Sequence, residues 1–203
     1  MVEEFNYPQS AGVTATPGPT PSQTVGPFFH YALPYESGPA VVGPQRHGAF
    51  RLSGRVLDGQ GEPIPDSLVE VWQADESGTL AQEHGIYDEP DGAGFRGFGR
   101  SATDESGEYA FRTVKPGPLT TRDGTVHAPH IAMAVFSRGM LRQAVTRVYF
   151  ADEGAANTTD PLLRLLDPHR RDTMIAQPGA DGYRFTVRVQ GEGETVFLDV
   201  STQ

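Results

Sequence analysis

Residues 115–150 read KPGPLTTRDGTVHAPHIAMAVFSRGMLRQAVTRVYF. Two apolar runs, HIAMAVF at 130–136 and AVTRVYF at 144–150, are separated by the turn-like SRGMLRQ. Within the first run, side chains would alternate between the two faces of a β-strand. The stretch therefore predicts two strands joined by a turn.

The first of these runs has the layout of a metal-binding strand but lacks the ligands. Two histidines placed two residues apart would point to the same side and could bind one ion. His130 is present, but Ala132 at the second position has no donor atom. His127, three residues before His130, would lie on the opposite face unless the chain bends at Pro129. We therefore expect no complete iron or zinc site in this chain.

The composition indicates a single all-β domain. The chain has 203 residues, and its 24 glycines and 17 prolines are spread between short apolar runs. Many turns between short strands are typical of a β-sandwich. Residues 1–19 are small, polar and rich in proline, which predicts a long extended N-terminal arm before a single domain over residues 20–203. An aromatic cluster follows the arm and is expected to dock on this chain's own core or on another chain: Phe28, Phe29, Tyr31 and Tyr35.

Charge and cysteine content narrow the possible function classes. The net charge is −10 and no basic run extends beyond Arg170–Arg171. Nucleic acid is therefore a poor partner, because neutralising phosphates needs clustered lysine and arginine. The absence of cysteine excludes disulfides and thiolate metal sites. No apolar segment approaches the roughly 20 residues of a membrane span, and the acidic start is unlike a signal peptide. These features predict a soluble, cytoplasmic protein.

The segment LVEVWQ at 68–73 predicts a central strand, because it is apolar apart from Glu70. Its Trp72 is expected to anchor the core. A buried Glu70 would need a partner such as an arginine. The glycine-rich stretch at 75–99 is expected to be a long loop with a functional or interfacial role.

Turn signals predict two further hairpins and two short helices. RSATDESGEYAFRTV at 100–114 has a hairpin pattern with its turn at 104–107, and YRFTVRVQGEGETVFLDV at 183–200 is expected to close the chain as a second hairpin. Aspartate followed by proline at 160–161 and again at 167–168 indicates two helix starts, each with an aspartate N-cap and proline at the first helical position.

Motifs for nucleophilic or phosphate chemistry are missing from the sequence. It contains no GxSxG segment, and GAGFRGFG at 92–99 lacks the lysine of a phosphate-binding loop. Arg138 and Arg147 flank the predicted turn after residue 136. Either could bind a carboxylate through two parallel hydrogen bonds, with surface solvation as the alternative for both.

Several segments together resemble the intradiol ring-cleaving dioxygenases. They are TPSQTVGPF, LVEVWQAD, FGRSATDESGEYAFRTVKPGP, APHI, TRVYF and QGEGETVF, and the resemblance runs from about Thr20 to the end of the chain. It is specific for the α-type chain of the members that cleave protocatechuate (3,4-dihydroxybenzoate). The resemblance implies a β-sandwich and a homologous β subunit that binds Fe(3+) through two tyrosines and two histidines. It also implies ring opening with O2 to 3-carboxy-cis,cis-muconate.

Carried over by this resemblance, the four iron-ligand positions fall on Leu80, Leu119, His130 and Ala132. Three of these side chains cannot bind iron, so the resemblance implies a chain with neither metal nor catalytic residues of its own, active only with its partner. A β-type arginine position matches His127, and a β-type glutamine position matches Arg147.

The resemblance also implies that this chain forms part of a substrate pocket at the boundary with the β subunit. The corresponding positions are Gly26, Pro27, Phe28 and Arg138, with Phe28 in place of a tyrosine. Arg138 would then bind the substrate carboxylate. The N-terminal arm would wrap a neighbouring subunit in a larger assembly of α and β chains.

Two other interpretations are considered. One is a non-catalytic β-sandwich that acts alone as a binding or structural protein. The other is a self-sufficient dioxygenase with ligands drawn from His127, His130 and either Tyr87 or Tyr109.

Overall fold

A computed structural model describes residues 24, 26, 28–81 and 90–200, without the side chains of Phe28 and His30. Its strands are β1 (Phe50–Leu57), β2 (Leu68–Trp72), β3 (Phe98–Ala102), β4 (Glu108–Thr113), β5 (Leu119–Thr120), β6 (Val126–His127), β7 (His130–Phe136), β8 (Ala144–Phe150), β9 (Ile175–Gly179), β10 (Gly182–Arg184) and β11 (Val187–Arg188). Its helices are α1 (Phe28–Ala32), α2 (Gly154–Thr159) and α3 (Pro168–Asp172), with a 3-10 turn η1 (Leu163–Leu165). The predicted arm at 1–19 lies outside the described residues.

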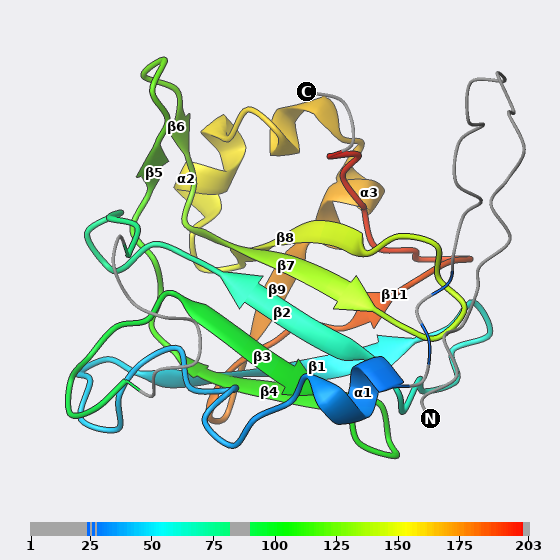
Figure 1. Cartoon of the computed structure of the whole chain (residues 1–203). Helices are drawn as coiled ribbons and strands as arrows, with labels where there is room; N and C mark the ends of the chain where they lie inside the picture. Colours follow the sequence, from blue (N-terminus) through cyan, green and yellow to red (C-terminus); the bar gives the residue numbers. More distant parts are fainter. Residues whose placement is uncertain (1–23, 25, 27, 82–89, 201–203) are drawn as a thin grey trace, which may run out of the picture.

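Nine of the described strands form one mixed sheet that folds into two layers (Figure 1). The strand order is β11-β1-β10-β9-β8-β7-β2-β3, and β4 also pairs with β1. Strand β9 pairs with β8 in parallel and with β10 in antiparallel, so it carries the sheet from one layer to the other. Strands β5 and β6 form a separate hairpin that projects from the sheet in Figure 1. The predicted all-β sandwich is confirmed.

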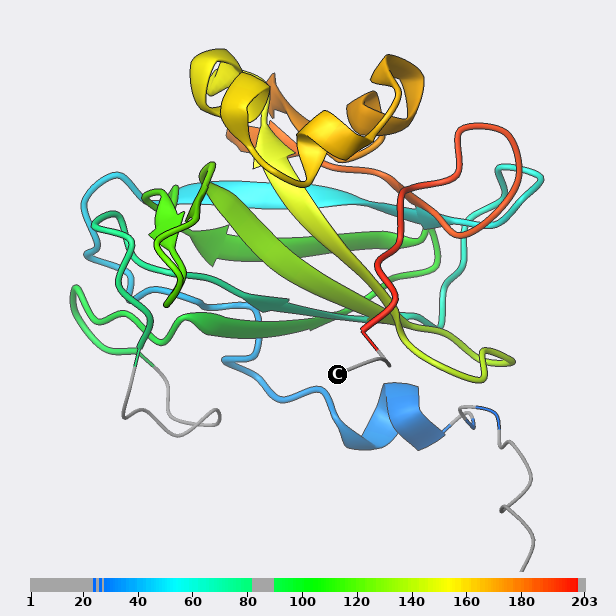
Figure 2. The same cartoon turned by 90° about the horizontal axis from the view of Figure 1, so that it is seen from above.

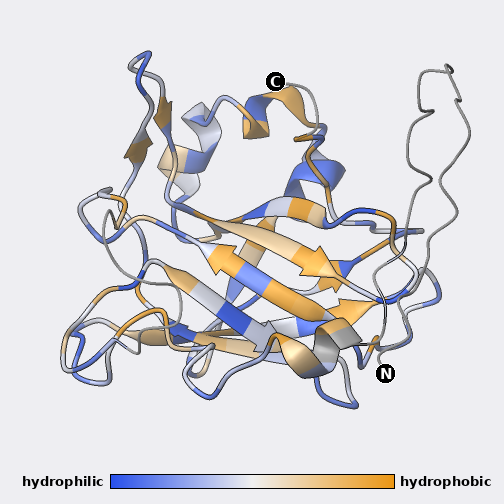
Figure 3. Cartoon of the chain, viewed as in Figure 1, coloured by the Kyte–Doolittle hydropathy of each residue, from blue (hydrophilic) through white to orange (hydrophobic). Residues whose placement is uncertain are grey.

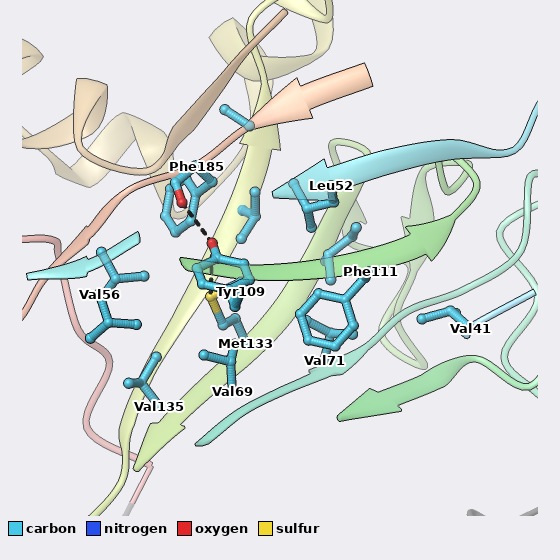
Figure 4. Close-up of a cluster of buried hydrophobic side chains, with 14 of the residues drawn as sticks. Val41, Leu52, Val56, Val69, Val71, Tyr109, Phe111, Met133, Val135 and Phe185 are labelled. Carbon is cyan, nitrogen blue, oxygen red and sulfur yellow. Dashed lines mark hydrogen bonds between the residues drawn. The ribbon is translucent and has the colours of Figure 1, made fainter. Parts of the chain in front are cut away.

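The core lies between the two layers (Figure 4). Leu52 of β1 and Phe111 of β4 belong to the same buried cluster as Val71 of β2 and Met133 of β7. Tyr109 is fully buried in this cluster and donates its hydroxyl to the carbonyl of Phe185 at 2.6 Å. Burial raises the pKa of the Tyr109 phenol, so the group stays neutral. The hydrophobic colouring in Figure 3 accordingly concentrates on the strands.

The turn predicted at 104–107 forms, but it does not join a hairpin. Gly107 N–H donates to the carbonyl of Asp104 at 2.9 Å, and the Asp104 carboxylate accepts the Ser106 N–H at 2.8 Å. Beyond this turn, β3 pairs with β2, whereas β4 pairs with β1. The predicted hairpin is therefore wrong: the turn crosses from one layer to the other, which lets each strand bury a face against the opposite layer.

The predicted closing hairpin at 183–200 is also wrong in its pairing. Both β10 and β11 pair in parallel with β1, and the described residues after β11 contain no further strand. They are held instead by separate contacts, such as Leu198 N–H to the carbonyl of Val145 at 2.7 Å. Within this segment, Phe185 and Val187 are buried.

Trp72 does not anchor the core, contrary to prediction. Its neighbour Val71 points into the core, so Trp72 lies on the outer face of β2, where it is 42% exposed and packs on the Phe98 ring at 5.2 Å. The strand itself is confirmed; the assumption that a large aromatic side chain must point inward was wrong.

The helices cover two opposite sides of the sandwich, as Figure 2 shows, with α1 on one side and α2, η1 and α3 on the other. Helix α3 begins at Pro168 after Asp167, as predicted, and η1 falls within the first predicted helical segment. Helices α1 and α2 were not predicted. Phe29 of α1 packs against Phe136 at 4.9 Å, so part of the aromatic cluster docks on this chain's own sheet. Among the described helices, none has the length and apolar character needed to cross a membrane.

Candidate functional site

The predicted site residues fall at two ends of β7. His130 begins the strand, and Arg138 lies two residues beyond its end. At about 3.3 Å per residue, these two positions are roughly 26 Å apart. They therefore belong to two separate candidate sites.

At the His130 end, a bend at Ala128–Pro129 brings the two histidines together. His127 belongs to β6 and pairs with Leu119, whereas His130 pairs with Tyr149 across β7 and β8. The ring centres of His127 and His130 are 5.9 Å apart. The alternative considered from the sequence, a bend at Pro129, is therefore the one observed, and it places the two histidines on different strands.

His130 is held as a neutral side chain. Its Nδ1 lies 2.8 Å from the carbonyl oxygen of Ala128, to which it donates. Burial lowers the pKa of the His130 imidazole to about 4. The ring packs on that of Tyr149, with 5.5 Å between the ring centres.

Asp160 is the buried anion of this site and was predicted only as a helix cap. Its carboxylate is 1% exposed and accepts hydrogen bonds from Ala128 N–H (3.0 Å), the Tyr149 hydroxyl (3.1 Å), Leu162 N–H (2.9 Å) and Leu163 N–H (3.1 Å). Burial alone would raise the pKa of Asp160, but these hydrogen bonds lower it below its ordinary value. The Asp-Pro motif was the only sequence signal for this residue.

Arg147 places a cation beside the two histidines. Its Nη1 lies 3.1 Å from His127 Nδ1 and 3.5 Å from the Tyr149 hydroxyl. Since a guanidinium nitrogen only donates, His127 accepts at Nδ1 and carries its proton on Nε2. Arg147 and Arg138 were both predicted as carboxylate-binding candidates, but the structure does not bring them together. Arg147 of β8 is paired with Ala132 near the start of β7, whereas Arg138 lies beyond the end of β7.

The residues at this end do not fit a ferric ion. Leu80 and Leu119, two of the four predicted ligand positions, line one surface depression of about 690 Å³ together with His127. Among the described residues, however, no three His, Cys, Asp or Glu side chains are grouped to hold a metal. The Arg147 guanidinium would in addition repel a cation.

At the other end, Arg138 is an exposed side chain in the turn after β7. It is 69% exposed, and its Nε lies 3.1 Å from a carboxylate oxygen of Asp66. Gly26 is exposed. Pro27 and the side chain of Phe28 lie outside the described residues. The start of α1 nevertheless lies near this end, because Phe29 contacts Phe136.

Of the two remaining candidate ligands, one lies in the core and the other lies outside the described residues. Tyr109 is a core residue and is unavailable as a ligand, and Tyr87 lies outside the described residues, as does 82–89 of the predicted 75–99 loop. A larger hollow of about 860 Å³ lies over β1 and β4, and of the predicted site residues that the structure describes it is lined by Tyr109 alone.

Comparison with known proteins identifies the relatives of this chain. A family model described as "Dioxygenase" matches residues 26–181. The protocatechuate 3,4-dioxygenase alpha chain of Pseudomonas putida is 40% identical over 89% of this chain and 96% of its own length. That of Burkholderia cepacia is 42% identical over 89% of this chain and 97% of its own length. The dioxygenase domain of a carbohydrate-binding fusion protein from Streptomyces sp. SirexAA-E has a TM-score of 0.53 at 27% identity, covering 84% of this chain and 96% of that domain.

Proposed function

The chain belongs to the intradiol dioxygenase family, and on that premise we propose that it is the non-iron-binding α subunit of a heteromeric protocatechuate 3,4-dioxygenase. In this proposal a homologous β subunit holds the ferric ion. The complex cleaves protocatechuate with O2 to 3-carboxy-cis,cis-muconate, and this chain shapes the substrate pocket and the assembly.

The observation that carries the proposal is that positions corresponding to iron ligands carry side chains without a metal-binding atom. Leu119 pairs with His127 beside the start of β7, and Leu80 lines the same depression. Ala132 lies two residues beyond His130 on the same strand. Two of the four corresponding positions thus line one depression, and three of the four carry aliphatic side chains without a donor atom. Any iron chemistry must then belong to a partner chain.

The contribution of this chain would come from the opposite end of β7. Arg138 has an exposed guanidinium, and its carboxylate partner Asp66 is itself at the surface. A surface ion pair of this kind is weak, so a substrate carboxylate buried at a subunit boundary can displace it. Gly26 and Pro27 precede α1 in the sequence and Phe28 is its first residue, and these three residues would form the adjoining wall of the partner's pocket.

The first test is to express this chain alone and together with a β-type chain. Iron content and protocatechuate-dependent O2 uptake are measured on both preparations. We expect stoichiometric iron and turnover only in the complex. Iron and turnover in the lone chain would contradict the proposal. A lone chain that forms no complex with any β-type chain would favour a stand-alone binding protein.

Replacing Arg138 with alanine in the complex should raise KM for protocatechuate roughly tenfold or more and leave KM for catechol nearly unchanged. The reason is that a charge-assisted hydrogen bond to a carboxylate contributes about 1.5–3 kcal/mol, and catechol has no carboxylate. Steady-state O2 uptake with both substrates measures the difference. Arg142→Ala, an exposed arginine in the same turn, is the matched control. An equal rise in KM for both substrates would show that Arg138 does not bind the substrate carboxylate.

A further inference from the structure

Trp72, Ala132 and Arg147 form one row across three neighbouring strands. Trp72 of β2 is paired with Ala132 of β7, and Ala132 is paired with Arg147 of β8. Directly paired residues in a sheet point to the same face. Neighbouring strands are about 4.8 Å apart, so the backbones at Trp72 and Arg147 are separated by roughly 10 Å. Ala132, the residue between them, has a small side chain and is partly exposed.

The surroundings of this row are apolar. Trp72 is 42% exposed and Leu80 is 53% exposed, although both are large hydrophobic side chains. An isolated bridge between Ala74 and Leu80 places Leu80 close to the end of β2. Leu80 and Leu119 also line the depression of about 690 Å³. A planar ring would find hydrophobic contacts here.

The charge in the row is not balanced by an acid. Among the described residues, no carboxylate forms an ion pair with Arg147. Its hydrogen bonds to described residues use Nη1 alone, toward His127 and Tyr149. The nearby carboxylate, Asp160, is saturated by hydrogen bonds from backbone N–H groups and Tyr149. A half-buried guanidinium therefore keeps Nε and Nη2 available for an anion.

We infer that the row of Trp72, Ala132 and Arg147 forms a shallow groove over Ala132, and that this groove binds a small aromatic carboxylate of the benzoate class. The carboxylate would lie on Arg147 and the ring between Ala132 and Trp72. The guanidinium fork matches the two oxygens of a carboxylate, and the apolar walls favour a ring over a simple inorganic anion. The site is separate from the one at Arg138 and needs no metal. It goes beyond the proposed function, because it is a second, non-catalytic site within this chain itself.

Tryptophan fluorescence provides a direct test, because the chain has one tryptophan and it lies in the groove. The full-length chain is titrated with benzoate, with uncharged benzamide and with acetate. We expect a saturable change with benzoate, and at least tenfold weaker binding of the two other compounds. Benzamide binding as tightly as benzoate would overturn the role of Arg147. Acetate binding as tightly would overturn the aromatic class.

Two variants separate charge from shape. Arg147→Gln should weaken benzoate binding at least tenfold, whereas the matched control Arg122→Gln, an exposed arginine on the rim of the depression, should bind like the wild type. Ala132→Leu fills the groove without changing any charge and should abolish binding. If Arg147→Gln fails to fold, the Ala132→Leu variant alone tests whether the benzoate site exists. Unchanged affinity in either folded variant would refute the site. Neither iron nor a partner chain enters this measurement, so its result is independent of the proposed function.

Discussion

Replacing Glu70 with alanine is expected to lower the free energy of unfolding by about 3–5 kcal/mol, because it leaves Arg100 buried without its counter-ion. The Arg100 Nε and Nη2 atoms lie 2.7 and 2.6 Å from Glu70 Oε1, and both side chains are only 9% exposed. The two residues are directly paired across β2 and β3, and Figure 3 shows hydrophilic bands on these two strands. Denaturant unfolding of the full chain, followed by circular dichroism, measures the change.

Two controls separate the buried charge from the loss of packing. In the double variant Glu70→Leu/Arg100→Met the unpaired charge is gone, so most of the lost stability should return. Glu108→Ala removes the partner of Arg51 in a more exposed ion pair and should cost less than about 1 kcal/mol. A cost below 1 kcal/mol for Glu70→Ala would show that Arg100 finds water or another partner.

Arg100 of this ion pair also contacts the segment after α1, which is close to the proposed subunit boundary. Arg100 Nη1 donates to the carbonyl of Leu33, just after α1, at 3.0 Å. Arg100 and Arg96 both lie against the Tyr35 ring. Breaking the pair should therefore loosen the segment that follows α1 as well as the sheet beneath it.

The sequence predicted that the partner of Glu70 would be an arginine, but it did not predict which arginine. A carboxylate inside an apolar strand must be neutralised, which led to the expectation of an arginine. That the arginine is Arg100 depends on β3 pairing with β2, and the sequence pattern had placed β3 in a hairpin with β4 instead. Short turns reveal where a chain reverses, but the partner of each strand is chosen by contacts between distant segments.

The same limit applies to the site at the start of β7. Residue chemistry and strand periodicity were enough to identify Ala132 as a position without a donor atom beside His130. The contact between His127 and His130 depended on a bend that the sequence only suggested through Pro129. Asp160 lies far along the chain, so only the tertiary fold brings its carboxylate to Tyr149 and Ala128.

Between pH 6.5 and pH 4 the chain is expected to lose roughly 3 kcal/mol of stability through His130 alone. Its pKa is lowered from 6.5 to about 4 because burial disfavours the charged imidazole. In this window the unfolded chain binds a proton at His130 that the folded chain does not bind. The contribution of His130 to the free energy of unfolding is therefore fully present above pH 6.5. It falls as the pH drops toward 4, by about 1.4 kcal/mol per pH unit.

His130→Gln separates this effect from the protonation of carboxylates. Hydrogen bonds lower the pKa of Asp160 below its ordinary value, so this carboxylate affects stability only toward the acid end of the window. Urea unfolding at half-unit steps from pH 7 to pH 4 should show a falling free energy for the wild type and a nearly flat one for His130→Gln above pH 4.5. The exposed His169 supplies the matched control, His169→Gln, which should keep the wild-type slope. An equal slope in His130→Gln and the wild type would mean that His130 reaches water in the folded chain, because only a solvated imidazole could accept the proton without losing stability.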